Sequence, residues 1–71
     1  MNADSLPILL DGKPHAVRSG TTLEVLVAEL GHAAHAVSTA INGDFVPRNQ
    51  RASTTLLAND AVLLFQPIVG G

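Results

Sequence analysis

One short amphipathic helix, marked at both ends, is the feature that most limits the folds open to this sequence. Four apolar residues recur at the spacing of a single helical face: Leu23, Leu26, Val27 and Leu30. The pattern predicts a helix over residues 22–30. Thr21 is a suitable N-cap with Glu24 three residues later, and Gly31 suits the left-handed position that ends a helix. Such a helix needs another element on which to bury its apolar side.

The segments around this helix have the composition of strands. They are residues 6–10, 14–18, 37–42, 45–46 and 61–65. Asp11-Gly12 and Asn42-Gly43 predict tight turns, because a primed hairpin turn requires positive φ at its central residues. The first two segments therefore form a hairpin.

The remaining segments complete the prediction of a sheet. Pro47 confines residues 45–46 to a sheet edge, whereas residues 61–65 are apolar on both faces, which predicts a central strand. Residues 49–55 are polar and predict an irregular connection. The sequence thus indicates an α+β fold in two layers, with a mixed sheet of four or five strands packed on one main helix.

Composition limits the classes of function. A chain of 71 residues predicts one domain over residues 1–71, with a disordered N-terminus at 1–5 and a flexible tail at 68–71. The formal net charge of −2, with only four Lys and Arg residues, argues against nucleic acid as a partner. The longest wholly apolar run, residues 61–65, is far below the ~20 residues that cross a membrane. Residues 1–5 lack a secretory signal, and we expect a cytoplasmic protein.

Catalytic and metal-binding patterns are weak. The chain has no cysteine, and its serines lie outside settings such as G-x-S-x-G. The acidic residues fit work in turns and caps. His32 and His35 could share a metal ion, but no third ligand lies nearby. We therefore expect no catalytic side chain, no metal and no bound cofactor, and the chain is not expected to be an enzyme.

The Gly70-Gly71 pair is the most informative feature, although a frayed tail is the simplest explanation of it. With Gly at ~7% of residues, about half a percent of chains would end this way by chance. The pair follows the predicted central strand closely. An ionised α-carboxyl is a nucleophile that can attack the α-phosphate of ATP, and the acyl-adenylate so formed is open to attack by sulfur. Glycines without Cβ atoms allow the tail to enter a narrow channel of another enzyme.

Four segments carry a resemblance to a known family. They are Ala40-Ile41-Asn42-Gly43, Val46-Pro47-Arg48, Leu63-Leu64-Phe65-Gln66 and Ile68-Val69-Gly70-Gly71. From Leu6 onward the sequence resembles the ThiS family, the sulfur carriers of thiamine biosynthesis. One departure is Asp-Ala-Val at 60–62, where the family often has a Gly-Asp turn.

The resemblance implies a ubiquitin-like β-grasp fold and a carrier that other proteins act upon. A ThiF-like adenylating enzyme would use ATP to activate Gly71. A cysteine-derived sulfur donor would then supply the sulfur of a thiocarboxylate, and the thiazole synthase ThiG would receive it.

One face of the predicted sheet has nothing in the sequence to cover it. Apolar residues there would form a docking surface for the partner proteins. The candidates are Phe45, Phe65, Ile68 and Val69, with Arg48 at the rim, although each apolar residue could equally belong to the core.

Other functions of the same tail stay open. Pro67 is similar to prolines in the tails of molybdopterin synthase small subunits, so the product could be molybdopterin or another sulfur-containing compound. A ubiquitin-like modifier conjugated to lysines would use the same activated tail. A non-covalent binding module would leave Gly70-Gly71 idle.

Overall fold

The strands form one five-stranded mixed sheet in the computed structural model, which describes residues 4–66. They are β1 (Ser5–Leu10), β2 (Lys13–Arg18), β3 (Ser38–Ile41), β4 (Asp44–Val46) and β5 (Ala61–Phe65). Their order across the sheet is β2-β1-β5-β3-β4. β1 and β5 run parallel, and the other neighbours are antiparallel. β5 is central and β4 lies at an edge, as the sequence predicted.

The described residues include only part of the two terminal segments that were predicted to be disordered or flexible. The N-terminal segment predicted to be disordered, residues 1–5, overlaps the sheet, because Ser5 is the first residue of β1 and pairs with Arg18. The Ser19 N–H also donates to the carbonyl of Asp4. The predicted flexible tail, residues 68–71, lies outside the described residues.

Both predicted hairpin turns are confirmed. Asp11 and Gly12 have φ values of 51° and 83° between β1 and β2, and Asn42 and Gly43 have values of 52° and 88° between β3 and β4. Left-handed geometry at both central residues is what a type I′ turn requires, and this turn matches the twist of the strands it joins. These dipeptides therefore set the register of both hairpins.

The helix α1 (Leu23–Glu29) and its N-cap each lie one residue later than predicted. Thr22, not Thr21, is the N-cap, and its Oγ1 accepts from the Val25 N–H at 3.3 Å. The predicted pairing of Thr21 with Glu24 is wrong because Thr21 is held elsewhere. Its carbonyl accepts from the Leu56 N–H at 2.9 Å, as part of an isolated antiparallel bridge between Thr22 and Thr55.

The end of α1 follows the prediction. Gly31 has a φ of 86°, and its N–H donates to the Ala28 carbonyl at 3.0 Å. The His32 N–H donates to the Val27 carbonyl at 3.2 Å, which completes a Schellman motif.

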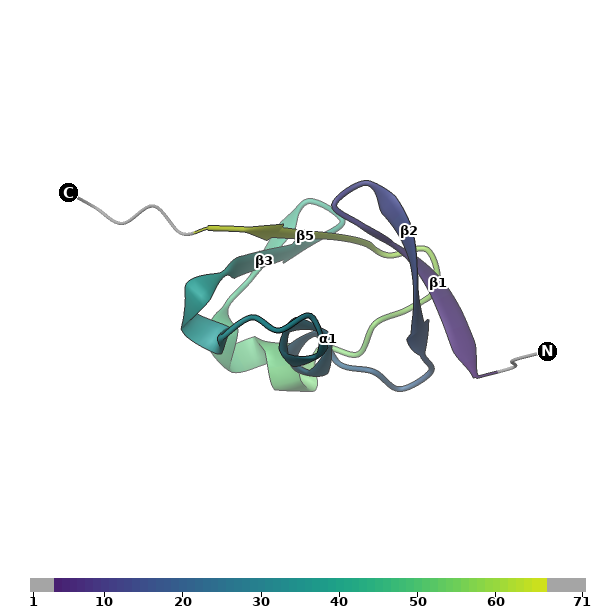
Figure 1. Cartoon of the computed structure of the whole chain (residues 1–71), viewed down its shortest axis with the longest axis horizontal. Helices are drawn as coiled ribbons and strands as arrows, with labels where there is room; N and C mark the ends of the chain where they lie inside the picture. Colours follow the sequence, from purple (N-terminus) through teal and green to yellow (C-terminus); the bar gives the residue numbers. More distant parts are fainter. Residues whose placement is uncertain (1–3, 67–71) are drawn as a thin grey trace.

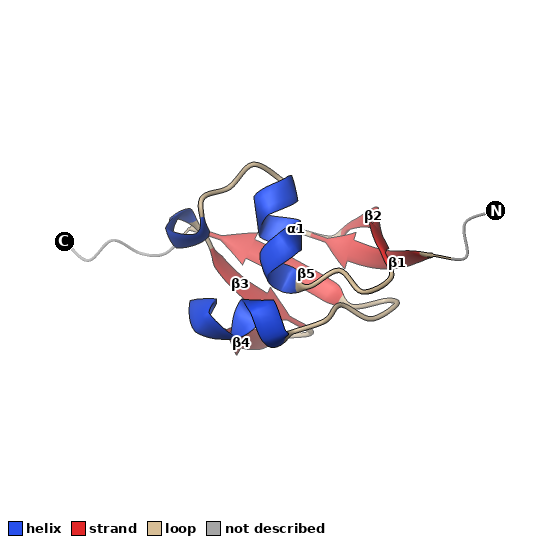
Figure 2. Ribbon diagram, turned by 90° about the horizontal axis from the view of Figure 1, so that it is seen from below, coloured by secondary structure: helices blue, strands red, loops and turns tan. Residues whose placement is uncertain are grey.

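Two 3₁₀ helices add to the helical layer: η1 (Ala34–Ala36) and η2 (Arg48–Ser53). The prediction of an irregular segment at 49–55 is wrong over most of its length. Pro47 has a φ of −61° and starts η2, and its carbonyl accepts from the Gln50 N–H at 2.9 Å. Figures 1 and 2 show α1, η1 and η2 on the same side of the sheet.

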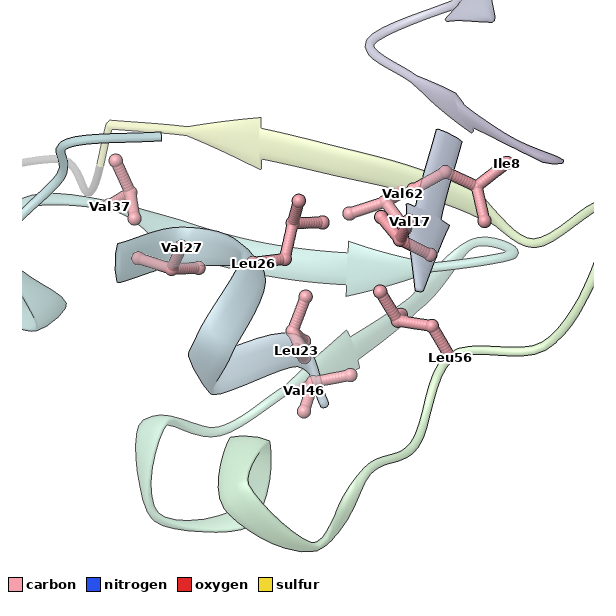
Figure 3. Packing of buried hydrophobic residues seen from close by; sticks show 9 residues of the cluster. All are labelled: Ile8, Val17, Leu23, Leu26, Val27, Val37, Val46, Leu56 and Val62. Carbon is pink, nitrogen blue, oxygen red and sulfur yellow. The ribbon is translucent and has the colours of Figure 1, made fainter. Parts of the chain in front are cut away.

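The core lies between this helical layer and one face of the sheet (Figure 3). Its buried apolar residues are Ile8, Val17, Leu23, Leu26, Val27, Val37, Val46, Leu56 and Val62. Three of the four residues of the predicted helical face are among them, and Leu30 packs against the cluster. The arrangement confirms the predicted α+β architecture, a mixed sheet on one main helix.

Candidate functional site

The face of the sheet opposite α1 carries large apolar side chains that are open to solvent. They are Leu9, Phe45, Leu63 and Phe65, with exposed fractions of 43%, 62%, 47% and 45%. We call these four residues the open-face patch. The strand register places Ala40 of β3 between Phe45 on one side and Leu63 on the other. Leu63 and Phe65 are alternate residues of β5, and Leu9 pairs with Ala61 of the same strand. The patch therefore extends across one face of the sheet and is not a scatter of single residues.

The patch arises from the alternation of side chains along β5. Val62 is fully buried beneath α1, whereas Leu63 and Phe65 lie on the opposite face. The sequence predicted a central strand with two apolar faces, and the central position is confirmed. The outward face is not buried, because all of the helical elements described lie on the other side of the sheet (Figure 1).

The structure places three of the predicted docking residues. Phe45 and Phe65 are exposed, as expected of a docking surface. Arg48 is exposed at the start of η2 and borders a groove together with Phe45, and its place at the rim of a docking surface stays a prediction. Leu9 and Leu63 were missed, although their alternation with buried Ile8 and Val62 was a signal that could have found them. The other predicted residues, Ile68, Val69, Gly70 and Gly71, lie outside the described residues.

The end of β5 leads toward the predicted working group. We call residues 64–66 the tail root, since residues 67–71 follow them directly. The Leu64 N–H donates to Asp11 Oδ1 at 3.0 Å. Asp11 and His32 also border a groove beside this end of the strand, together with the tail root itself.

Arg51 is a buried cation that sequence reasoning missed. Its side chain is 3% exposed, and it donates three hydrogen bonds to neutral oxygens. Nε donates to Thr39 Oγ1 at 3.1 Å, Nη1 to the Ala34 carbonyl at 2.9 Å and Nη2 to the Val37 carbonyl at 2.6 Å. Burial and, to a lesser extent, the charge of Arg48 lower the pKa of Arg51 below its ordinary value.

The role of Arg51 is structural on this geometry. It ties η1 and β3 to η2, and Thr39 continues the chain of bonds by donating to the Val46 carbonyl at 3.0 Å. The sequence around position 51 does not indicate a buried arginine, because the hydrogen-bond partners of Arg51 lie 12 to 17 residues away in the sequence.

Two acidic residues do the turn and capping work that the sequence predicted. Asp60 accepts from the Leu57 N–H at 2.8 Å and from Asn42 Nδ2 at 3.1 Å. Asn42 Oδ1 in turn accepts from the Ala61 N–H at 2.9 Å. Asp11 acts in the same way on Leu64. These contacts fix both ends of β5.

His32 and His35, the pair considered for a metal, are both exposed. Among residues 4–66, no three His, Cys, Asp or Glu side chains gather closely enough to hold a metal ion. In the same part of the chain, none of the helices has both the length and the apolar character that crossing a membrane requires.

Known proteins resemble this chain in sequence and in structure. The model of the ThiS family matches residues 8–71. The sulfur carrier protein ThiS of Escherichia coli strain K12 is 33% identical over 66 residues, covering 93% of this chain and 100% of that protein. A crystal structure of the thiamine biosynthesis protein ThiS from Geobacter metallireducens has a TM-score of 0.81 at 26% identity, covering 93% of this chain and 100% of that one. An NMR structure of a thiamine biosynthesis protein from the same organism has a TM-score of 0.75 at 28% identity, covering 93% and 88%.

Proposed function

Because this chain belongs to the ThiS family, we propose that it is a sulfur carrier of thiamine biosynthesis and that the α-carboxyl of Gly71 carries the sulfur. The observation that carries the proposal is the family match, which extends to residue 71 and so includes the Gly70-Gly71 pair. The protein is a co-substrate in this scheme, and separate enzymes supply the catalysis.

The chemistry takes place in two steps at one carboxyl group, the first at an oxygen and the second at the carbon. A carboxylate oxygen of Gly71 attacks the α-phosphate of ATP in a ThiF-like activating enzyme, and pyrophosphate leaves. Sulfide released from cysteine then attacks the acyl carbon, and AMP leaves with the carboxyl oxygen. The product is a thiocarboxylate, from which the thiazole synthase ThiG takes the sulfur. Glycine suits this role because it has no stereocentre to scramble and no Cβ to obstruct a narrow channel.

The short tail supports docking on the open-face patch. Residues 67–71 span at most about 16–18 Å when fully extended, so an enzyme that binds the Gly71 carboxylate must come close to the end of β5. Phe65 of the patch is one residue from the end of the tail root, and Leu63 lies beside it on the same face. Apolar surface at this place suits a partner that must hold the tail and bury the adjoining face.

The decisive experiment measures sulfur on the protein. Incubated with ATP, a matching activating enzyme and a cysteine-derived sulfur source, the chain is expected to gain the mass difference between sulfur and oxygen. Deleting Gly71 withdraws the carboxylate by about 3.3–3.6 Å. Because a displacement of ~1 Å can cost ~100-fold in rate, the truncated chain is expected to stay unmodified while remaining folded by circular dichroism.

The same assay separates the alternatives. Activating enzymes of the thiamine and molybdopterin pathways are compared side by side, and modification by the first with sulfur transfer to ThiG supports the proposal. Modification by the second alone assigns the carrier to molybdopterin. A chain that neither enzyme modifies, or a truncated chain that still gains sulfur, contradicts the carrier chemistry.

A further inference from the structure

The parallel ladder between β1 and β5 ends on a side chain. The Leu9 N–H donates to the Asp60 carbonyl and the Asp11 N–H donates to the Val62 carbonyl, both at 2.9 Å. The even spacing of a parallel ladder then requires the Leu64 N–H to donate to the backbone carbonyl of residue 11. It donates instead to Asp11 Oδ1, at 3.0 Å. A carboxylate thus takes the place of a backbone acceptor.

The geometry of the hairpin turn explains why a side chain replaces the backbone acceptor. β1 ends at Leu10, and Asp11 has a φ of 51°, so the chain leaves the direction of the strand at this residue. Aspartate tolerates the left-handed conformation, and its short side chain reaches nearby N–H groups. One residue therefore closes the first hairpin and extends the ladder on β5 by one bond.

This bond acts on the tail root. On its other side, β5 pairs with β3 through Leu64 opposite Thr39 and Phe65 opposite Ser38. On the β1 side, the Asp11 carboxylate makes the last hydrogen bond to β5 that the structure describes. Without it, the final residues of β5 would be held along one edge only.

We propose that Asp11 is a positioning residue for the reaction at Gly71, because its carboxylate holds the tail root in line with the sheet. This inference rests on the proposed sulfur-carrier function. Residues 67–71 can reach at most about 17 Å when fully extended, and a tilt of ~10° at the tail root would displace the end of that reach by ~3 Å. Because we expect the activating enzyme to realign part of a displaced tail on binding, the expected loss is about tenfold in turnover rather than the larger factor that a free displacement would cause.

The test compares two substitutions that suit the same turn. Asp11→Gly accepts positive φ without strain and lacks the acceptor, whereas Asp11→Asn also accepts it and keeps an Oδ1. Pyrophosphate release by the activating enzyme is measured against carrier concentration. Asp11→Gly is expected to lower kcat about tenfold with the KM for the carrier within about twofold, and Asp11→Asn to restore at least half of kcat. Exchange of the Leu64 amide hydrogen is expected to rise in the first variant only.

A matched control removes similar bonds from the other end of β5. Asp60→Ala loses the contacts with Leu57 and Asn42, which lowers stability without touching the tail root, so kcat is expected to stay near that of the unaltered chain. If Asp11→Gly keeps its kcat, or loses no more than Asp60→Ala, the positioning role is overturned while the carrier function stands. If the unaltered chain is never adenylated, the proposed function fails and the positioning role fails with it.

Discussion

At the scale of single residues, Arg51 shows how a charged group can be accommodated in a small core. A buried guanidinium loses its hydration, and the cost is several kcal/mol unless hydrogen bonds replace the lost water. Here a hydroxyl and two carbonyl oxygens do so. The carbonyls belong to Ala34, the first residue of η1, and to Val37, which links η1 to β3, so the side chain fixes the path of the chain through η1 into β3.

We expect Arg51→Ala to lower the free energy of unfolding by about 3 kcal/mol, because buried acceptors lose their donor and a cavity is left. Arg51→Lys should give an intermediate loss, since an ammonium cannot reproduce the planar arrangement of donors. Arg48→Ala is the matched control, because Arg48 is exposed and its loss should change stability by no more than about 0.5 kcal/mol. Urea unfolding measures all three variants, and equal midpoints for Arg51→Ala and Arg48→Ala would contradict the structural role.

At the scale of elements, the N-cap of α1 is Thr22 in the structure, whereas the sequence predicted Thr21, and a substitution can decide between them. Thr22→Ala should lower the free energy of unfolding by about 1 kcal/mol, because the Val25 N–H loses its acceptor. In a domain of this size that corresponds to a decrease in Tm of about 4–8 °C. Thr22→Ser keeps the hydroxyl and should lose much less. A thermal unfolding series in which the Ala and Ser variants have the same Tm would contradict the assigned cap.

The elements also show which parts of the fold could be read from the sequence. Asp11-Gly12, Asn42-Gly43 and the helix with its terminal Gly31 were predicted because turn chemistry and helical periodicity are local. The cap at Thr22 was missed by one residue, since a contact between Thr21 and Leu56 decides it. η2 was missed because its internal bonds involve polar residues whose pattern is not amphipathic.

In the candidate site, too, some residues were predicted from the sequence and others were not. The exposure of Phe45 and Phe65 followed from composition and from the expectation of an uncovered sheet face. Leu9 and Leu63 were missed, although both belong to predicted strands, because the alternation of side chains along those strands was not used to assign each residue to a face. Arg51 and the Asp11 carboxylate could not be predicted, because their partners are brought together by the tertiary fold.

At the scale of the whole molecule, the described helical elements cover one face of the sheet and leave the other open (Figure 1). If the open-face patch is the docking surface, Phe45→Thr and Leu63→Thr should each raise the KM for the carrier in the activation assay about tenfold. Leu57→Thr is the matched control, because Leu57 is 64% exposed but lies outside the sheet. Threonine suits a strand, so stability should change little in the two patch variants. A KM that is unchanged in both, or raised equally by Leu57→Thr, would remove the patch from the interface.

The central place of β5 has a consequence for the biosynthesis of the protein. β5 is the last strand along residues 4–66, yet it separates β1 from β3, so neither of these strands has its full set of neighbours until residues 61–65 are available. During translation, the β1–β2 hairpin and α1 emerge from the ribosome well before the strand that joins them to the rest. Pairing between β1 and β5 also closes a loop of about 50 residues, the kind of non-local contact that slows folding. The sheet is therefore complete only after residues 61–65 have been synthesised, and a chain that stops short of β5 has no stable sheet from which to present a tail.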